Sequence, residues 1–298
     1  MGVGKSQAEL PGGISELLVQ VAGNARAALM EHAIARGHGV EVAEFTVSDL
    51  LDDSARRRQM IAWYRERLPG VRGLVSLHGA FRELMPGATD ARMRAATRDR
   101  VVQCLDIAEE LGARCVVFHS GHDVVLLSPQ HLSAWIERQA AFWREVMAGR
   151  SARLLLENAW EPSPEVAIAV VEALGVEAIG ICFDTGHAHL WTGREGEALD
   201  WYARQMGAVR ARSAAEWLER LGNRVAYLHL SDNNQTGDQH LPPGRGTLDW
   251  RQLLTAMERQ RLNVPAVMEV GGVEGARETE EFLRGLAVTG ERQQGNAR

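Results

Sequence analysis

The chain has 298 residues, of which 45% are hydrophobic and 24% charged, an ordinary balance for a soluble globular protein with a large core. It contains no run of 18 apolar residues, so we expect no membrane partner, and its N-terminus lacks the basic-then-apolar pattern of a secretory signal. The net charge of −6 does not indicate nucleic-acid binding, and three cysteines without a CxxC pair favour a reducing, cytoplasmic location.

Eight apolar runs alternate with segments of helical periodicity. The expected strands cover 1–7, 40–45, 73–78, 114–119, 153–157, 179–184, 225–230 and 264–270. The expected helices cover 14–36 (ended by Gly37 and Gly39), 53–67, 89–111, 128–148, 164–174, 195–221 (one or two helices), 250–261 and 276–288. This alternation predicts an α/β fold, a single (β/α)8 TIM barrel over 1–290 with a polar, frayed tail over 291–298. Two doubly wound half-domains are the alternative.

Six of the predicted strands end in, or carry near their end, a side chain that can bind a metal. These side chains are His78, His119, Glu157, Asp184, His229 and Glu269. The active site of such a barrel lies at the C-terminal ends of the strands, so we expect the six to meet there. Side chains alternate along a strand, so the residues two positions earlier should line the barrel interior. They are Ser76, Val117, Leu155, Cys182, Tyr227 and Val267.

Two loops add further candidate ligands. His187 follows Asp184 by three residues, and the stretch after His229 offers Asp232, Asp238 and His240 in a polar loop. Each residue alone has a structural explanation, such as a hydrogen-bonded histidine or a glutamate paired with an arginine. Converging carboxylates repel one another, however, and a bound cation would remove that repulsion. Apart from Asp232, four carboxylates and five imidazoles remain. These nine residues exceed the four ligands that zinc prefers, so they are enough for two or three ions.

The ordered motifs HGAF, VVFHSGH, LLLEN, CFDTGHAH, HLSDNNQTGDQHLPPGRGTLDW and VMEV, over about residues 40–270, resemble the xylose isomerase-like barrel superfamily. This superfamily includes endonuclease IV and the sugar-phosphate isomerases and epimerases. The resemblance to endonuclease IV implies three zinc ions on nine side chains, here His78, His119, Glu157, Asp184, His187, His229, Asp238, His240 and Glu269. The resemblance to the single-metal epimerases implies four ligands, here Glu157, Asp184, His229 and Glu269, with the two glutamates also acting as acid and base.

The loops around these motifs depart from the endonuclease pattern. Endonuclease IV has a basic and aromatic DNA-entering loop after its second strand, whereas TVSDLLDD here is acidic and lacks an aromatic residue. Phe81, Trp160 and Trp191 are candidate apolar walls of a sugar pocket, although the tryptophans would equally cap the barrel. Arg245 is a candidate grip for a phosphate or carboxylate, with a solvated loop arginine as the alternative.

We therefore expect a Zn²⁺- or Mn²⁺-dependent isomerase or epimerase that acts on a small sugar or sugar-phosphate-like substrate by proton transfer. The first alternative is an endonuclease IV-like phosphodiesterase acting on abasic-site DNA, and only this reading makes nucleic acid a partner. The second is a barrel that binds a metal or ligand without turning it over. The sequence leaves the oligomeric state open.

Overall fold

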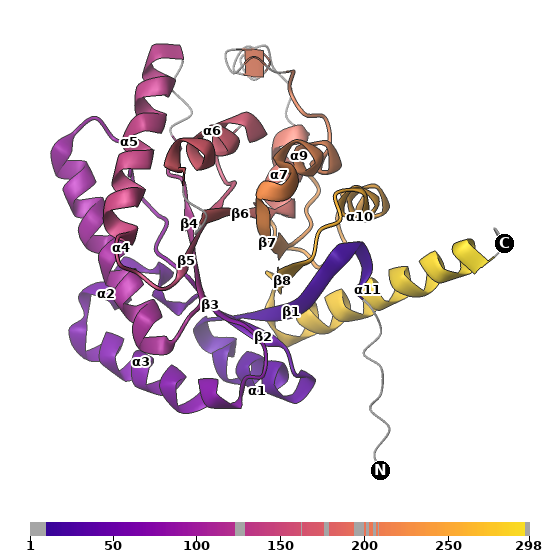
Figure 1. Ribbon diagram of the computed structural model, residues 1–298. Coiled ribbons are helices and arrows are strands. Elements are labelled where there is room, and N and C mark those ends of the chain that lie inside the picture. Colours follow the sequence, from indigo (N-terminus) through magenta and orange to yellow (C-terminus); the bar gives the residue numbers. More distant parts are fainter. Residues whose placement is uncertain are drawn as a thin grey trace.

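Eight short apolar runs form parallel strands that close into one barrel with helices around it (Figure 1). This computed structural model describes residues 10–122, 129–161, 163–175, 179–193, 200, 203–204, 207 and 209–295. The strands pair in chain order and β8 returns to β1. They are β1 (Ile14–Val21), β2 (Gly39–Val42), β3 (Val75–His78), β4 (Cys115–His119), β5 (Arg153–Glu157), β6 (Ile179–Asp184), β7 (Val225–Leu230) and β8 (Val264–Met268). The predicted (β/α)8 barrel is confirmed.

The helices cover the outer face of the barrel and bury their apolar sides against the strands (Figure 1). They are α1 (Arg26–Arg36), α2 (Ser48–Asp52), α3 (Ser54–Arg67), α4 (Ala91–Leu111), α5 (Pro129–Met147), α6 (Pro164–Leu174), α7 (Thr185–Thr192), α9 (Ala214–Leu221), α10 (Trp250–Arg259) and α11 (Gly272–Gly295). Over the described residues, none of the helices combines the length and apolarity that crossing a bilayer requires.

Side chains on the inner faces of the strands fill the barrel. Leu18, Val117, Leu155, Cys182, Tyr227 and Val267 form one fully buried cluster. The Tyr227 hydroxyl shares a 2.6 Å hydrogen bond with that of Ser76, so the polar interior pair is satisfied. The prediction of which residues line the interior is therefore confirmed. The residue two positions after each of them points to the same face and reaches the C-terminal mouth of the barrel.

The prediction of one helix over 14–36 is wrong in its first half, because β1 occupies Ile14–Val21. The apolar residues of this segment are spaced as on one helix face, which hid the strand from a periodicity analysis. The segment lies between β8 and β2 and hydrogen-bonds to both, so its backbone groups are satisfied within the sheet. Gly23, with φ of +64°, turns the chain into α1. The strand expected at 1–7 lies outside the described residues.

The C-terminal helix is longer than predicted. α11 continues to Gly295, so most of the stretch expected as a frayed tail is helical. This part of the chain has no proline and several long, straight side chains, which favour the continuation of a helix. Of the helical region expected at 195–221, the structure gives α9, and part of the remainder lies outside the described residues.

The barrel interior generates a stability prediction. Val117 is fully buried in the inner cluster, whereas Val209 is 73% exposed. We expect Val117→Ala to lower the free energy of unfolding by about 2–3 kcal/mol, because it removes two buried methyl groups and leaves a cavity. Val209→Ala should change it by less than about 0.5 kcal/mol. Urea unfolding of both variants measures the difference, and equal midpoints would contradict an interior packed in this way.

Candidate metal centre

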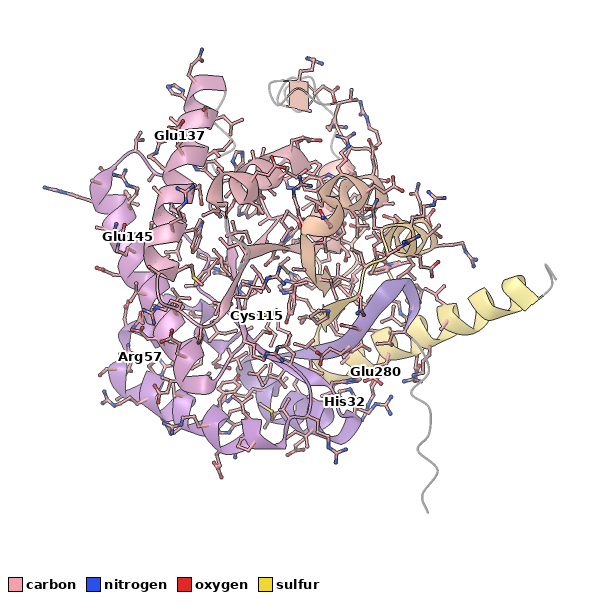
Figure 2. All side chains as sticks on the ribbon, viewed as in Figure 1. His32, Arg57, Cys115, Glu137, Glu145 and Glu280 are labelled. Carbon is pink, nitrogen blue, oxygen red and sulfur yellow. The ribbon has the colours of Figure 1, made fainter. Side chains whose placement is uncertain are left out.

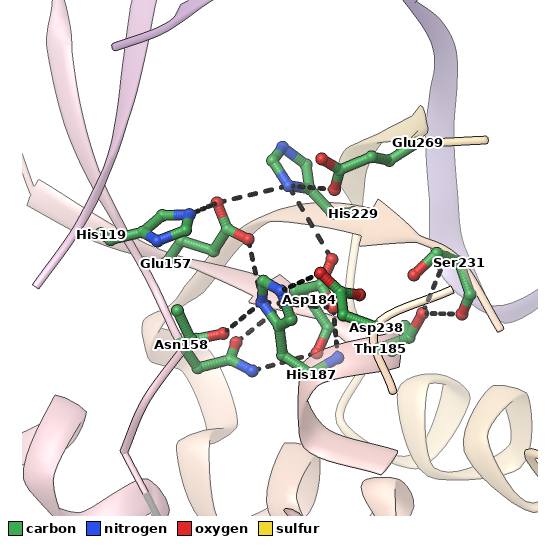
Figure 3. A network of polar contacts seen from close by, with 12 residues as sticks. His119, Glu157, Asn158, Asp184, Thr185, His187, His229, Ser231, Asp238 and Glu269 are labelled. Carbon is green, nitrogen blue, oxygen red and sulfur yellow. Dashed lines mark hydrogen bonds and ion pairs between the residues drawn. The ribbon is translucent and has the colours of Figure 1, made fainter. Parts of the chain in front are cut away.

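The strand register brings the predicted ligands together at the barrel mouth. His119 on β4 lies directly opposite Glu157 on β5, and Asp184 on β6 lies directly opposite His229 on β7. Glu269 follows the last residue of β8, and its carboxylate lies beside the His229 ring (Figure 3). Residues opposite each other in a parallel sheet share a face, so these side chains converge.

We call Glu157, Asp184, His229 and Glu269 the main cluster. Each offers one ligand atom, and these four atoms lie within 4.8 Å of one another. His229 Nδ1 is 2.9 Å from Glu269 Oε2, 3.5 Å from Glu157 Oε2 and 4.0 Å from Asp184 Oδ2. None of these contacts is aligned as a hydrogen bond, and three of the buried atoms have no hydrogen-bond partner: His229 Nδ1, Asp184 Oδ2 and Glu269 Oε2. Unsatisfied buried polar atoms are costly, and a divalent cation would satisfy all three at once.

A second cluster shares one carboxylate with the first. The ligand atoms of His78, His119 and Glu157 also lie within 4.8 Å of one another. Nε2 of His78 is 3.2 Å from Glu157 Oε2, and Nε2 of His119 is 3.4 Å from the same oxygen. Glu157 therefore stands between the two clusters, which is the position of a carboxylate that can bridge two ions.

Three of the histidines have one ring nitrogen fixed by a backbone carbonyl. Nδ1 of His78, His187 and His240 lies 2.9, 2.9 and 3.3 Å from such an oxygen. A carbonyl only accepts hydrogen bonds, so each Nδ1 carries a proton and Nε2 is left to face a carboxylate. That carboxylate is Glu157 for His78, at 3.2 Å, and Asp238 for the other two, at 3.3 and 3.0 Å. Metal-bound histidines are held in this way.

The remaining predicted ligands are assembled more loosely. His187 and His240 meet only through Oδ2 of Asp238, whose side chain is 39% exposed. Over the described residues, none of the compact ligand groups includes any of these three. Burial lowers the pKa of His240, but the hydrogen bond to Asp238 and the negative charges of Glu269, Asp238 and Asp184 together outweigh burial and raise the pKa to about 9. Six of the nine predicted ligands thus belong to compact groups, and the other three form a looser trio.

Two polar residues inside the barrel complete the main cluster, and sequence reasoning missed both. Glu41 on β2 is fully buried, and its Oε2 is 3.2 Å from His229 Nε2. Gln20 lies opposite it on β1 and donates to Glu41 Oε1 at 3.2 Å and to Glu269 Oε1 at 2.9 Å. Glu41 thereby holds the Nε2 proton of His229 and leaves Nδ1 for the main cluster. The sequence does contain a signal for this role of Glu41, because it is the single charged residue within the apolar run GVEV.

Asp232, a possible oxygen ligand by sequence, organises the loop instead. It is fully buried, and its carboxylate accepts four hydrogen bonds. The donors are the backbone amides of Asn233, Gly244 and Leu248 and the indole of Trp250. This carboxylate therefore fixes the path of the loop that carries Asp238 and His240.

The predicted substrate contacts lie in different surroundings. The ring of Phe81 stacks on His119, with centroids 4.6 Å apart, and lines a cavity of about 540 Å³. Trp191 is tied to the Ala159 carbonyl by a 2.8 Å hydrogen bond, while Trp160 is 55% exposed. Arg245 is exposed and donates to Glu278 Oε2 at 2.7 Å. Phe81 thus adjoins the candidate ligands, whereas Arg245 is held at α11.

The protonation states at the mouth suit a cation. Burial raises the pKa of Asp184 to about 7, despite the opposing charge of His187. Burial also acts to raise the pKa of Glu157, but the positive charges of His229 and His119 hold it well below its usual range. At neutral pH Glu157 is therefore a carboxylate. Asp184 loses its proton near neutral pH, so a cation that binds it can displace that proton readily.

Comparison with known proteins agrees with this architecture. The profile of a family described as xylose isomerase-like TIM barrel matches residues 33–286. A Thermus thermophilus protein, solved after soaking with ZnCl2, has 28% identity and a TM-score of 0.71 over 92% of this chain and 98% of its own. A D-tagatose 3-epimerase-like protein (20% identity, TM-score 0.72, 93% and 99% coverage) and an L-ribulose 3-epimerase (15%, 0.68, 95% and 98%) share the fold.

The two clusters predict the metal content. We expect protein purified without chelator to hold at least two divalent ions per chain, and Glu157→Gln to lower that number because Glu157 belongs to both clusters. Elemental analysis of the two proteins measures the stoichiometry. Less than half an equivalent of any divalent metal, after reloading with zinc or manganese, would contradict the assignment.

The position of Glu41 predicts an indirect effect on metal affinity. Glu41→Gln keeps the shape but removes the charge that faces His229 Nε2. We expect metal affinity to fall by about 10- to 100-fold, because the amide no longer places a full negative charge against the Nε2 proton of His229. Competition with a chromophoric chelator measures the affinity. The exposed Glu31→Gln on α1 is the control, and equal affinities of the two variants would count against this role.

Proposed function

The chain belongs to the xylose isomerase-like TIM barrel family, and we propose that it is a divalent-metal-dependent isomerase or epimerase of a small sugar or sugar-phosphate-like substrate. Two of the solved structures that share its fold are named as a D-tagatose 3-epimerase-like protein and an L-ribulose 3-epimerase. These names support a sugar as the substrate class. The Thermus thermophilus protein soaked with ZnCl2 makes zinc the first ion to test, with manganese as the second.

The observation that carries the proposal is the placement of two glutamates around one point. Glu157 comes from β5 and Glu269 from the end of β8, so they reach His229 Nδ1 from different sides of the barrel. Epimerisation needs one group that removes a proton from a carbon and another that returns a proton to its opposite face. Two carboxylates that flank a shared site supply such a pair.

Each residue of the main cluster then has a role. Glu157 accepts the proton from the carbon beside the substrate carbonyl, and Glu269 supplies a proton to the other face, or to the adjacent carbon in an isomerisation. The bound divalent ion would polarise the carbonyl and the neighbouring hydroxyl and so make that C–H bond more acidic. Asp184 and His229 complete the candidate ligand set, and Gln20 orients Glu269 through its 2.9 Å hydrogen bond.

The cavity beside the second cluster supports a small substrate. The phenyl ring of Phe81 offers an apolar surface next to His119, suited to the carbon face of a sugar. The charged residues that line this cavity are two acidic and two basic ones, so their charges balance: Asp49, Arg82, Glu83 and Arg100. Arg100 is also bound to Asp52 at 2.8 Å. A groove for DNA needs an excess of positive charge along its length, and this lining has none.

A metal-dependent phosphodiesterase acting on abasic-site DNA is the second candidate. The second cluster favours it, because His78 and His119 offer a further ion two imidazoles beside Glu157. Phosphodiester hydrolysis uses clustered ions to generate the nucleophile and to hold the departing oxygen. A barrel that binds a metal or ligand without turnover is the third candidate, and only activity measurements separate it from the other two.

The main test combines one variant with one isotope. Incubation of a ketose or ketose-phosphate panel with the metal-loaded protein in D2O should place deuterium on the carbon beside the carbonyl, and mass spectrometry detects it. Glu157→Gln should abolish this exchange with the fold intact, because the amide keeps the shape but has no basicity. Glu137→Gln on the exposed side of α5 is the matched control and should retain full exchange.

The contrary outcomes are distinct. Unchanged exchange in a folded Glu157→Gln protein would make Glu157 structural. Metal-dependent incision of an abasic-site duplex by catalytic amounts of protein, with binding that weakens steeply with salt, would replace the isomerase proposal by the phosphodiesterase. If the protein has no activity on sugars and none on abasic-site DNA, the result would favour the non-catalytic barrel.

A further inference from the structure

A second group of histidines and a carboxylate lies far from the mouth. His32 is on α1, His38 is in the turn just before β2, and Glu280 is on α11. Figure 2 shows His32 and Glu280 close together where the first and last helices meet. His38 precedes the first residue of β2, which places the group toward the N-terminal ends of the strands, at the opposite end of the barrel from the candidate active site.

The carboxylate of Glu280 has its two oxygens in different surroundings. Oε1 is 2.8 Å from His32 Nε2 and 3.0 Å from His38 Nε2. Oε2 accepts from the guanidinium groups of Arg36 and Arg284. Glu280 is 3% exposed, whereas both arginine side chains are about half exposed. One oxygen therefore faces only imidazoles and the other only guanidiniums.

We infer that His32, His38 and Glu280 form a separate binding site for a divalent transition-metal ion such as Zn²⁺. The three ligand atoms lie within 4.8 Å of one another. Tetrahedral zinc with bonds of about 2.0–2.1 Å keeps its ligand atoms roughly 3.3 Å apart, so the observed 2.8 and 3.0 Å need to open by only a few tenths of an ångström. Oε1 binds the ion while Oε2 keeps its guanidinium partners, as in zinc sites whose carboxylate is held from outside.

A cavity gives access to the fourth coordination position. A space of about 630 Å³ borders His38 and Glu280 and is also lined by Arg36, Arg72 and Arg284. Water or a small anion can reach an ion at Oε1 through this space, and the arginines favour an anion there. The site is thus open on one side, with three protein ligands and one exchangeable position.

The ligands connect elements that are distant in the chain. The site joins α1 to α11 beside the seam where β1 pairs with β8. An ion held there binds the folded chain and has no comparable site in the unfolded one, so it stabilises the fold by mass action. The site therefore acts on stability and leaves the proton-transfer chemistry of the mouth unchanged.

The test separates this site from the mouth by paired variants. Against wild type, His38→Ala should lose one zinc equivalent per chain and keep its sugar exchange activity, and the neighbouring exposed Glu281→Gln should lose none. In a Glu157→Gln background, which removes the carboxylate shared by both mouth clusters, zinc should still raise the unfolding temperature. Adding His38→Ala to that background should make the rise clearly smaller. The zinc content and the unfolding temperature are independent of whether the mouth proves to be an isomerase.

A measurement on the unaltered protein covers the case of a variant that does not fold. Crystals of the wild-type protein soaked in zinc should give an anomalous peak between His32, His38 and Glu280 at the zinc absorption edge. Its absence, or equal zinc content in a folded His38→Ala protein, would overturn the proposal and leave the three residues as a hydrogen-bonded brace between α1 and α11.

Discussion

The cost of burying negative charge governs the organisation of the barrel mouth. Glu41, Glu157, Asp184 and Glu269 are each at most 8% exposed and belong to one connected group of contacts. Carboxylates placed this close in a low-dielectric interior destabilise the fold unless positive charge or hydrogen-bond donors accompany them. The imidazoles, the Gln20 amide and the orphaned atoms of the main cluster all follow from this constraint. The site is a balance of charges, and a bound cation would complete it.

Glu157 couples the two candidate clusters. Its Oε2 is within 3.5 Å of ring nitrogens from His78, His119 and His229, and its Oε1 is 3.2 Å from His187 Nδ1. A side chain shared in this way cannot adjust to an ion in one cluster without changing the ligand geometry of the other. The arrangement also accounts for the two functional readings, since the same residue is the proton-transfer group of one proposal and the bridging ligand of the other.

The parts of the structure that sequence predicted correctly are those set by strand periodicity. The residues at the ends of β3 to β7 converge because parallel strands end at one edge of the barrel and alternate residues share a face, and both facts can be read from the apolar runs. β1 was predicted as a helix because its apolar residues Ile14, Leu17, Leu18 and Val21 have helical spacing. Only its pairing with β8 and β2 makes this segment a strand. The role of Asp232 depends on contacts with distant backbone amides, which no local pattern reveals.

The barrel closes where β8 pairs with β1, so it cannot close during synthesis until β8 has been made. β8 is the last strand to leave the ribosome, and until it does both β1 and β7 have one edge without a partner. Open edges of apolar parallel strands are prone to pair with other chains, so the nascent barrel is most vulnerable just before its end. Glu269 also arrives with β8, so no incomplete chain carries the full main cluster. An ion of the main cluster would therefore be captured only after β8 has been made.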